Sequence, residues 1–239
     1  MSAQHLQDLS RPVALVTAAS RGIGEACARK LHEKGFRLAL MARSDAIKPL
    51  ANELGAFHVQ GSVTEFTDLK KLFHGALGQY GRVDCVVCNT GHAAKGALTE
   101  ITDEQWIQGM EMYFLSVARL ARLVTPVMAG QGGGVFVNIS SAAAINPNSD
   151  YPVSCALRAA LGNYIQLFAS QHAAQGIRMN NVLPGFVNNH PVSEKNMSPI
   201  AAGRPATPEE IGSVVAWLAS SESSFVNGQE ITVDGGRVF

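Results

Sequence analysis

The sequence has no surplus of either charge, because its 19 lysine and arginine residues are matched by 19 aspartate and glutamate residues. Binding to nucleic acid calls for a basic surplus that neutralises phosphates. The sequence also has no apolar run of membrane-spanning length, since its longest apolar runs are only as long as strands. We therefore expect neither a nucleic-acid nor a membrane partner.

The first ten residues, MSAQHLQDLS, lack both the cationic start and the apolar stretch of a signal peptide. This absence predicts a soluble, cytoplasmic protein. A chain of 239 residues with 46% hydrophobic residues is long enough to bury one large core. We predict a single domain over residues 1–239.

Cysteine is scarce, with four residues, of which two form the motif Cys85-x-x-Cys88. The motif lies in the run VDCVVC, which is typical of a buried strand. Side chains three positions apart on a strand point to opposite faces, so this pair suits neither a metal site nor a redox pair. We expect packed, buried cysteines and no bound metal.

Short apolar runs rich in Val, Ile and Leu alternate with helical patterns, which is the order that builds βαβ units. Because the runs are apolar at every position, we expect strands that are buried on both faces between layers of helices. The predicted fold class is α/β, a Rossmann-type doubly wound parallel sheet with helices on both faces. The expected strands are 13–16, 38–41, 83–88, 135–139, 179–183 and 231–233.

Two helix starts carry capping-box signals, since Thr102 is followed by Gln105 and Thr207 by Glu210, with Pro208 at the first helical position of the second. We expect long helices over 102–129 and 152–175. The segment 188–204 has no clear periodicity, and it is either a substrate lid or a plain surface loop. Together with residues 146–152 it would form the substrate pocket.

The residues that follow the first strand point to a dinucleotide. Thr17-Ala18-Ala19-Ser20-Arg21-Gly22-Ile23-Gly24 leads directly from a strand into a helix. A helix N-terminus offers unpaired backbone N–H groups and a positive dipole end to a pyrophosphate, and glycines allow its close approach. The strand-turn-helix setting makes this interpretation more specific than the glycines alone.

This turn resembles that of the short-chain dehydrogenase/reductase family, which reads TGxxxGxG, with Ala18 in place of the first glycine. We expect Ala18 to tighten the pocket slightly while cofactor binding survives. The resemblance extends over nearly the whole chain through motifs that follow in the family's order: Asn89-Thr90-Gly91, Ile139-Ser140-Ser141, Pro184-Gly185 and Val233-Asp234-Gly235-Gly236.

An acidic residue about 20 positions beyond the turn would select NAD, and the sequence lacks one. The second strand is followed by Arg43 instead, and Arg21 lies in the turn, so two guanidinium groups favour the 2′-phosphate of NADP(H) over NAD(H). The alternative is that both arginines are solvated surface charges. The resemblance implies cofactor contacts from Thr17, Ser20, Arg21, Gly22, Ile23, Gly24, Arg43, Ser62, Val63, Asn89, Gly91, Pro184, Gly185, Val187 and Asn189.

In this family a serine orients the substrate oxygen, a tyrosine thirteen residues later transfers the proton, a lysine four residues beyond supports both, and an upstream asparagine completes a water relay. Ser141 matches the serine, and Arg158-Ala159-Ala160-Leu161 matches the family's KAAL. Both intervals are kept without a gap, and they place Ser154 at the tyrosine and Arg158 at the lysine. Tyr113 falls at the asparagine.

A serine hydroxyl is a far weaker acid than a phenol, and arginine is effectively never deprotonated, so these residues cannot simply substitute. Tyr151 or Tyr113 are candidate alternative acids. If Tyr151 is the acid, the match of Arg158-Ala159-Ala160-Leu161 to KAAL is lost. If Tyr113 is not the acid, its ring fills space in the core. His92 is either an acid near neutral pH or a surface residue.

Three hypotheses follow. The first is an NADP(H)-dependent oxidoreductase on a small carbonyl or alcohol, with weak, non-standard or lost activity. The second is a non-catalytic cofactor-binding or partner subunit, since a fold does not guarantee an activity. The third resembles the family's halohydrin dehalogenase branch, against which the missing tyrosine and the retained Gly22-Ile23-Gly24 argue. The resemblance also implies a homotetramer or homodimer assembled through helices 102–129 and 152–175.

Overall fold

The computed structural model describes residues 11–189 and 200–237. These residues form a seven-stranded sheet in the order β3-β2-β1-β4-β5-β6-β7, in which every pairing is parallel. The order reverses between β1 and β4, and at such a point the carboxyl ends of the strands open a crevice. The fold-class prediction is confirmed. The strands are β1 (Val13–Val16), β2 (Arg37–Ala42), β3 (Phe57–Gln60), β4 (Cys85–Cys88), β5 (Gly134–Ile139), β6 (Ile177–Pro184) and β7 (Glu230–Val233).

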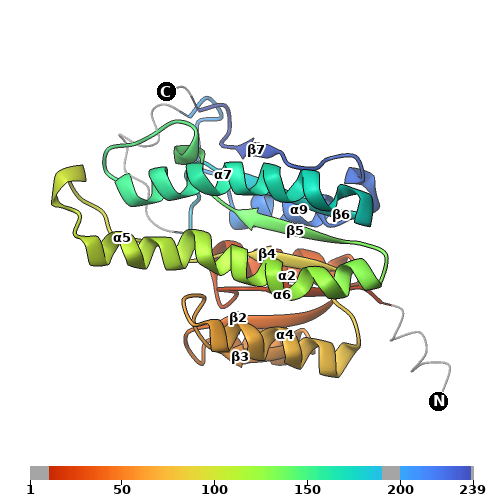
Figure 1. Ribbon diagram of the computed structural model, residues 1–239. Coiled ribbons are helices and arrows are strands. Elements are labelled where there is room, and N and C mark those ends of the chain that lie inside the picture. Colours follow the sequence, from red (N-terminus) through yellow and green to blue (C-terminus); the bar gives the residue numbers. More distant parts are fainter. Residues whose placement is uncertain (1–10, 190–199, 238–239) are drawn as a thin grey trace, which may run out of the picture.

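Helices cover both faces of the sheet (Figure 1). On one face lie α2 (Gly22–Glu33), α3 (Ile47–Glu53) and α9 (Pro208–Leu218). On the other face lie α4 (Phe66–Tyr80), α7 (Pro152–His172) and a long helix made of α5 (Asp103–Met110), η2 (Glu111–Leu115) and α6 (Ser116–Gly130). Short single turns join them: η1 (Leu98–Glu100), η3 (Ala142–Ala144), η4 (Ala173–Gln175) and η5 (Ser221–Ser223).

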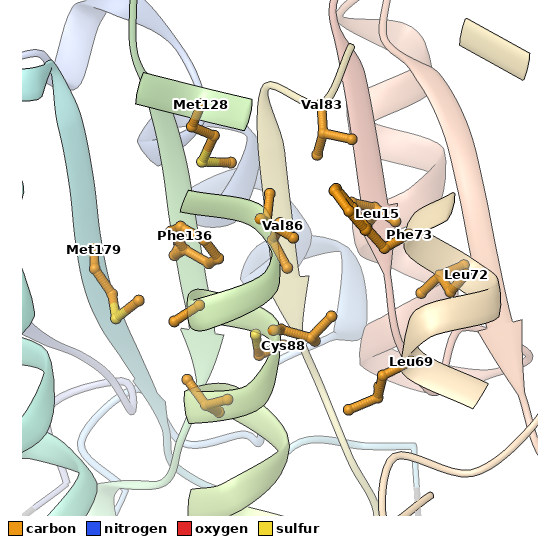
Figure 2. Packing of buried hydrophobic residues seen from close by; sticks show 14 of the residues in the cluster. Leu15, Leu69, Leu72, Phe73, Val83, Val86, Cys88, Met128, Phe136 and Met179 are labelled. Carbon is orange, nitrogen blue, oxygen red and sulfur yellow. The ribbon is translucent and has the colours of Figure 1, made fainter. Parts of the chain in front are cut away.

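The core has two layers because successive strand residues point to opposite faces of the sheet. Leu15 packs in one cluster, while its neighbour Val16 packs in the other. Figure 2 shows the first cluster, where strand side chains meet those of α4 and α6. The members labelled there are Leu15, Leu69, Leu72, Phe73, Val83, Val86, Cys88, Met128, Phe136 and Met179.

The cysteines behave as the sequence predicts. Cys85 belongs to one core layer and Cys88 to the other, and all four cysteines are free and buried. Burial raises the pKa of Cys88 to about 12, so its thiolate is not populated near neutral pH. Within residues 11–189 and 200–237, no three His, Cys, Asp or Glu side chains cluster in a way that would hold a metal ion.

Both capping boxes are present, with the Thr102 and Thr207 hydroxyls accepting from Gln105 and Glu210 and both reciprocal bonds formed. The sequence did not predict β3. This strand and β7 lie at the two edges of the sheet and are only half-buried, so the expectation of burial on both faces holds for the inner strands alone.

The continuous helix Asp103–Gly130 has 28 residues and is apolar enough by composition to cross a membrane. One such helix is weak evidence for a membrane span, because core helices of soluble proteins meet the same criterion. Its apolar side is buried against the sheet through Val117, Leu120, Val124 and Met128.

Most of the expected lid, 188–204, lies outside the described residues, because 190–199 are not among them. Of the remainder, Asn188 donates its backbone N–H to Ala206, and Ile200 pairs with Arg237 in an isolated bridge. The lid function and the single domain over residues 1–239 stay predictions.

Candidate active site and cofactor cleft

The turn between β1 and α2 leaves donors available for an anionic ligand. Arg21 is the N-cap of α2, has an extended backbone, and makes no side-chain capping bond among the described residues. The N–H groups of the first helical turn have no acceptor within the helix, and they point along the positive end of its dipole. Residues Gly22, Ile23 and Gly24 therefore present the arrangement that suits a phosphate.

Hydrogen bonds hold this turn against β4. The Thr17 hydroxyl donates to the carbonyl oxygen of Asn89 at 2.6 Å and accepts from its backbone N–H at 2.9 Å. The Asn89 side chain then donates to the carbonyl oxygen of Ala18 at 3.2 Å. Thr17 and Asn89 are both buried and shape the turn, and their cofactor contacts stay a prediction.

Two residues in the turn show why small side chains are needed. A Cβ on Gly24 would collide with the Ala18 carbonyl oxygen and lie 2.7 Å from the Asn89 amide nitrogen. Ala18 itself has a φ of +48°, the left-handed region that an L-residue enters at a cost of about 1–2 kcal/mol. Alanine in place of the family's glycine therefore strains the backbone. The sequence predicted a slight tightening of the pocket at Ala18 but not this backbone strain.

The expected adenosine end lies at the same edge of the sheet. Arg43 follows β2, and its Nη2 atom lies 4.0 Å from the position that a Cβ on Gly91 would take after β4. Because β1 lies between β2 and β4, the guanidinium extends across the end of the strand that leads into the turn. Ser62 and Val63 follow β3, where the Ser62 N–H donates to Asp68.

A cavity of about 420 Å³ lies beside the turn and brings most of the predicted catalytic residues together. It joins the first turn of α2 to the start of α7 and to the segment after β6. Its lining comprises Ile23, His92, Lys95, Ser140, Ser141, Ala142, Ala143, Asn148, Tyr151, Ser154, Arg158, Pro184, Gly185, Phe186, Val187, Asn189 and Arg237.

Arg158 lies one helical turn beyond Ser154 and is held by neutral groups. Its Nε donates to the Ser154 hydroxyl at 3.1 Å, and its Nη1 donates to the carbonyl oxygen of Ile139 at 2.7 Å. Burial lowers the pKa of the guanidinium from its ordinary value, and Tyr113 opposes that shift. Ser141 is the N-cap of η3, and its hydroxyl accepts from the backbone N–H of Ala143.

Tyr113 lies beneath Arg158 and is not among the residues that line the cavity. The guanidinium carbon sits 4.1 Å from the centre of the Tyr113 ring, which suits a cation–π contact. The phenol oxygen accepts the backbone N–H of Ala93 at 2.7 Å. Tyr113 sits in the π-helical turn η2, a feature often found at functional sites. Its contacts suit positioning of Arg158 and of the loop after β4.

Tyr151 lines the cavity and precedes the first residue of α7. The Lys95 ammonium lies 4.9 Å from the centre of its ring. Within residues 11–189 and 200–237, no hydrogen bond joins a tyrosine hydroxyl to Ser141. His92 also lines the cavity and is exposed.

Sequence reasoning missed several lining residues, above all Lys95, Ser140 and Arg237. Lys95 lies in an irregular loop after β4, where no periodicity indicates the direction of a side chain. For Ser140, the one signal in the sequence was its position next to Ser141, the predicted catalytic serine. Of the predicted cofactor residues, those outside the cavity lining lie on the adenosine side or in the turn itself: Thr17, Ser20, Arg21, Gly22, Gly24, Arg43, Ser62, Val63, Asn89 and Gly91.

Comparison with known families agrees with this geometry. The model of a family described as enoyl-(acyl carrier protein) reductase matches residues 17–237. The chain belongs to the short-chain dehydrogenase/reductase family of oxidoreductases. Membership implies a nicotinamide cofactor, which the open N-terminus of α2 fits.

Individual relatives match along almost their whole length. The chain is 33% identical to nodulation protein G of Rhizobium sp. (strain N33), over 96% of this chain and 98% of that protein. It is 31% identical to 3-oxoacyl-[acyl-carrier-protein] reductase FabG of Thermotoga maritima, covering 96% and 99%. Among solved structures, acetoin dehydrogenase from Enterobacter cloacae matches with a TM-score of 0.87 and 27% identity, over 95% of each chain.

Proposed function

We propose that this protein binds NADP(H) and is nominally an oxidoreductase for a small carbonyl or alcohol, with a substituted catalytic tetrad and weak, non-standard or lost activity. Ser141 is retained, while Ser154, Arg158 and Tyr113 stand in place of tyrosine, lysine and asparagine. The observation that carries this proposal is the Ser154–Arg158 hydrogen bond beside Ser141 in one cavity. Ser154 and Arg158 keep the family's spacing of tyrosine and lysine, but their side chains differ from these two in acidity.

The bound cofactor would supply a hydride to the carbonyl carbon, and the carbonyl oxygen would need a proton. Ser141 and Ser154 can donate hydrogen bonds to that oxygen and orient it. Neither hydroxyl is acidic enough to give up its proton readily, and Arg158 keeps its own. Arg158 can still hold a nicotinamide ribose hydroxyl. We therefore expect the protein to bind the cofactor even if its rate of reduction is low.

The preference for NADP(H) rests on Arg43 and Arg21, both exposed at the carboxyl edge of the sheet. Charge-assisted bonds from arginine to a phosphate predict that NADPH binds about 10 to 100 times more tightly than NADH. Fluorescence titration measures both dissociation constants. In Arg43→Leu we expect the NADPH constant to rise by about that factor while the NADH constant changes little, and Arg43→Lys should fall between. Tighter binding of NADH to the wild type would reject the preference.

A non-catalytic cofactor-binding or partner subunit is the second candidate. The observation in its favour is that no tyrosine hydroxyl is bonded to Ser141 within the described residues. The halohydrin dehalogenase-like alternative gains no such support, because the turn at Gly22 and Gly24 keeps its donors.

We also propose that the protein is cytoplasmic and forms a homodimer or homotetramer through α5–α6 and α7. A surface cavity of about 450 Å³ lies between α6 and α7, and Leu167 beside it is 64% exposed. Light scattering of the wild type should give the mass of two or four chains, and Leu167→Glu should shift it towards one. A wild type that is monomeric at all concentrations would contradict the assembly.

A further inference from the structure

More positive than negative side chains line this cavity, and the transfer of a hydride to a neutral carbonyl compound does not require that excess of positive charge. Lys95 and Arg158 line it and bring two positive charges to it. None of the lining residues within the described parts of the chain is an aspartate or a glutamate. For the whole sequence the two charges balance, so the imbalance is local to this cavity.

Burial of a charge costs free energy, and among these residues the cost is greatest for Arg158, which is only 7% exposed. Its contacts are the Ser154 hydroxyl, the Ile139 carbonyl oxygen and the Tyr113 side chain, and none of the ion pairs among the described residues includes it. A buried cation without a counter-charge is strongly disfavoured. Arg37 is buried in a similar way, but it does not line this cavity, where a ligand could supply the missing charge.

Two further groups strengthen the case for an anion. Lys95 brings an exposed ammonium to the cavity, beside the Tyr151 ring. Ser140 lines the cavity and is 6% exposed, and its buried hydroxyl has no hydrogen-bond partner within the described residues. Buried polar atoms are normally satisfied, so an unpartnered hydroxyl on a residue that lines a cavity favours a polar ligand there.

The cofactor's own phosphates do not account for these groups. They are expected at the N-terminus of α2, whereas Lys95 follows β4 and Tyr151 precedes α7. The ribose expected at Arg158 is uncharged. We propose that the substrate of this site is a small carbonyl compound that carries an anionic group, a carboxylate or a phosphate, which binds between Lys95 and Arg158. This inference rests on the proposed function, since it names the substrate class of the same cleft.

Matched pairs of probes test the charge requirement directly. Dissociation constants would be measured by calorimetry, on the apoprotein and on the NADPH-saturated protein, for acetoacetate against methyl acetoacetate and for dihydroxyacetone phosphate against dihydroxyacetone. We expect one or both anions to bind about ten times more tightly than the neutral partner. The stronger pair identifies carboxylate or phosphate, and the advantage should shrink as salt rises.

Lys95→Met is the matched variant, because Lys95 is exposed and its replacement is compatible with folding. It should lose most of the advantage of the anion while the neutral probe binds as before. Lys34→Met, at the far end of α2, should change neither. Neutral probes that bind as well as anions, or a Lys95→Met variant that weakens both equally, would overturn the inference. The NADPH titration is a separate arm, and failure there alone would refute the proposed function.

Discussion

The double variant Ser154→Tyr/Arg158→Lys is expected to reduce small ketones with NADPH about 100 times faster than the wild type, or more. A positioned general acid contributes roughly 100-fold to 10,000-fold, and a phenol near a lysine ammonium is such an acid. Ser154 lines a cavity of about 420 Å³, so a ring at this position has room. The measurement is the rate of NADPH consumption at saturating ketone.

The control for this prediction is Ser154→Phe/Arg158→Lys, which adds the same ring without its hydroxyl and should stay near the wild-type rate. Tyr151→Phe in the wild-type background tests a relocated acid. If the wild type is already fast and loses its activity in Tyr151→Phe, the proton comes from Tyr151 and the proposed loss of the acid is wrong.

Gly24→Ala is expected to lower the free energy of unfolding by about 1–3 kcal/mol and to abolish measurable NADPH binding. Overpacking costs of this size arise where neighbouring atoms cannot move aside. Here the added Cβ would collide with the backbone carbonyl oxygen of Ala18, which belongs to the phosphate turn itself. Urea unfolding and NADPH titration measure the two effects.

Gly78→Ala is the matched control, because it lies inside α4 and a Cβ there meets no atom within 4 Å. Alanine is the better helix former by about 0.5–1 kcal/mol, so this variant should be more stable than the wild type and should bind NADPH normally. Equal effects from the two substitutions would show that the turn at Gly24 tolerates a side chain.

The fold could be predicted from the sequence because the inner strands are apolar on both faces. The expected strand at 13–16 agrees with β1, and the other five expected strands fall within two residues of the observed bounds. The strand β3 was missed because its sequence FHVQ is short and half polar. At the sheet edge it needs no continuous apolar run, so the signal that revealed the inner strands was absent.

The position of the candidate site could be predicted from the sequence, but the contacts and the backbone strain within it could not. Spacing placed Ser154 and Arg158 together, and the structure brings them to hydrogen-bonding distance. Nothing in the sequence indicates that Tyr113 lies under the guanidinium or that its hydroxyl holds the Ala93 N–H. Those contacts depend on how the π-helical turn packs against α7, which is a tertiary property. The strain at Ala18 likewise needs backbone coordinates.

A crystal structure of the NADPH complex is the most direct test of the account. We predict the pyrophosphate at the first turn of α2, the Arg158 guanidinium at the nicotinamide ribose, and the Ser141 and Ser154 hydroxyls facing the hydride-donating carbon. A tyrosine hydroxyl within hydrogen-bonding distance of Ser141, or a cofactor bound away from the turn at Gly22, would contradict it.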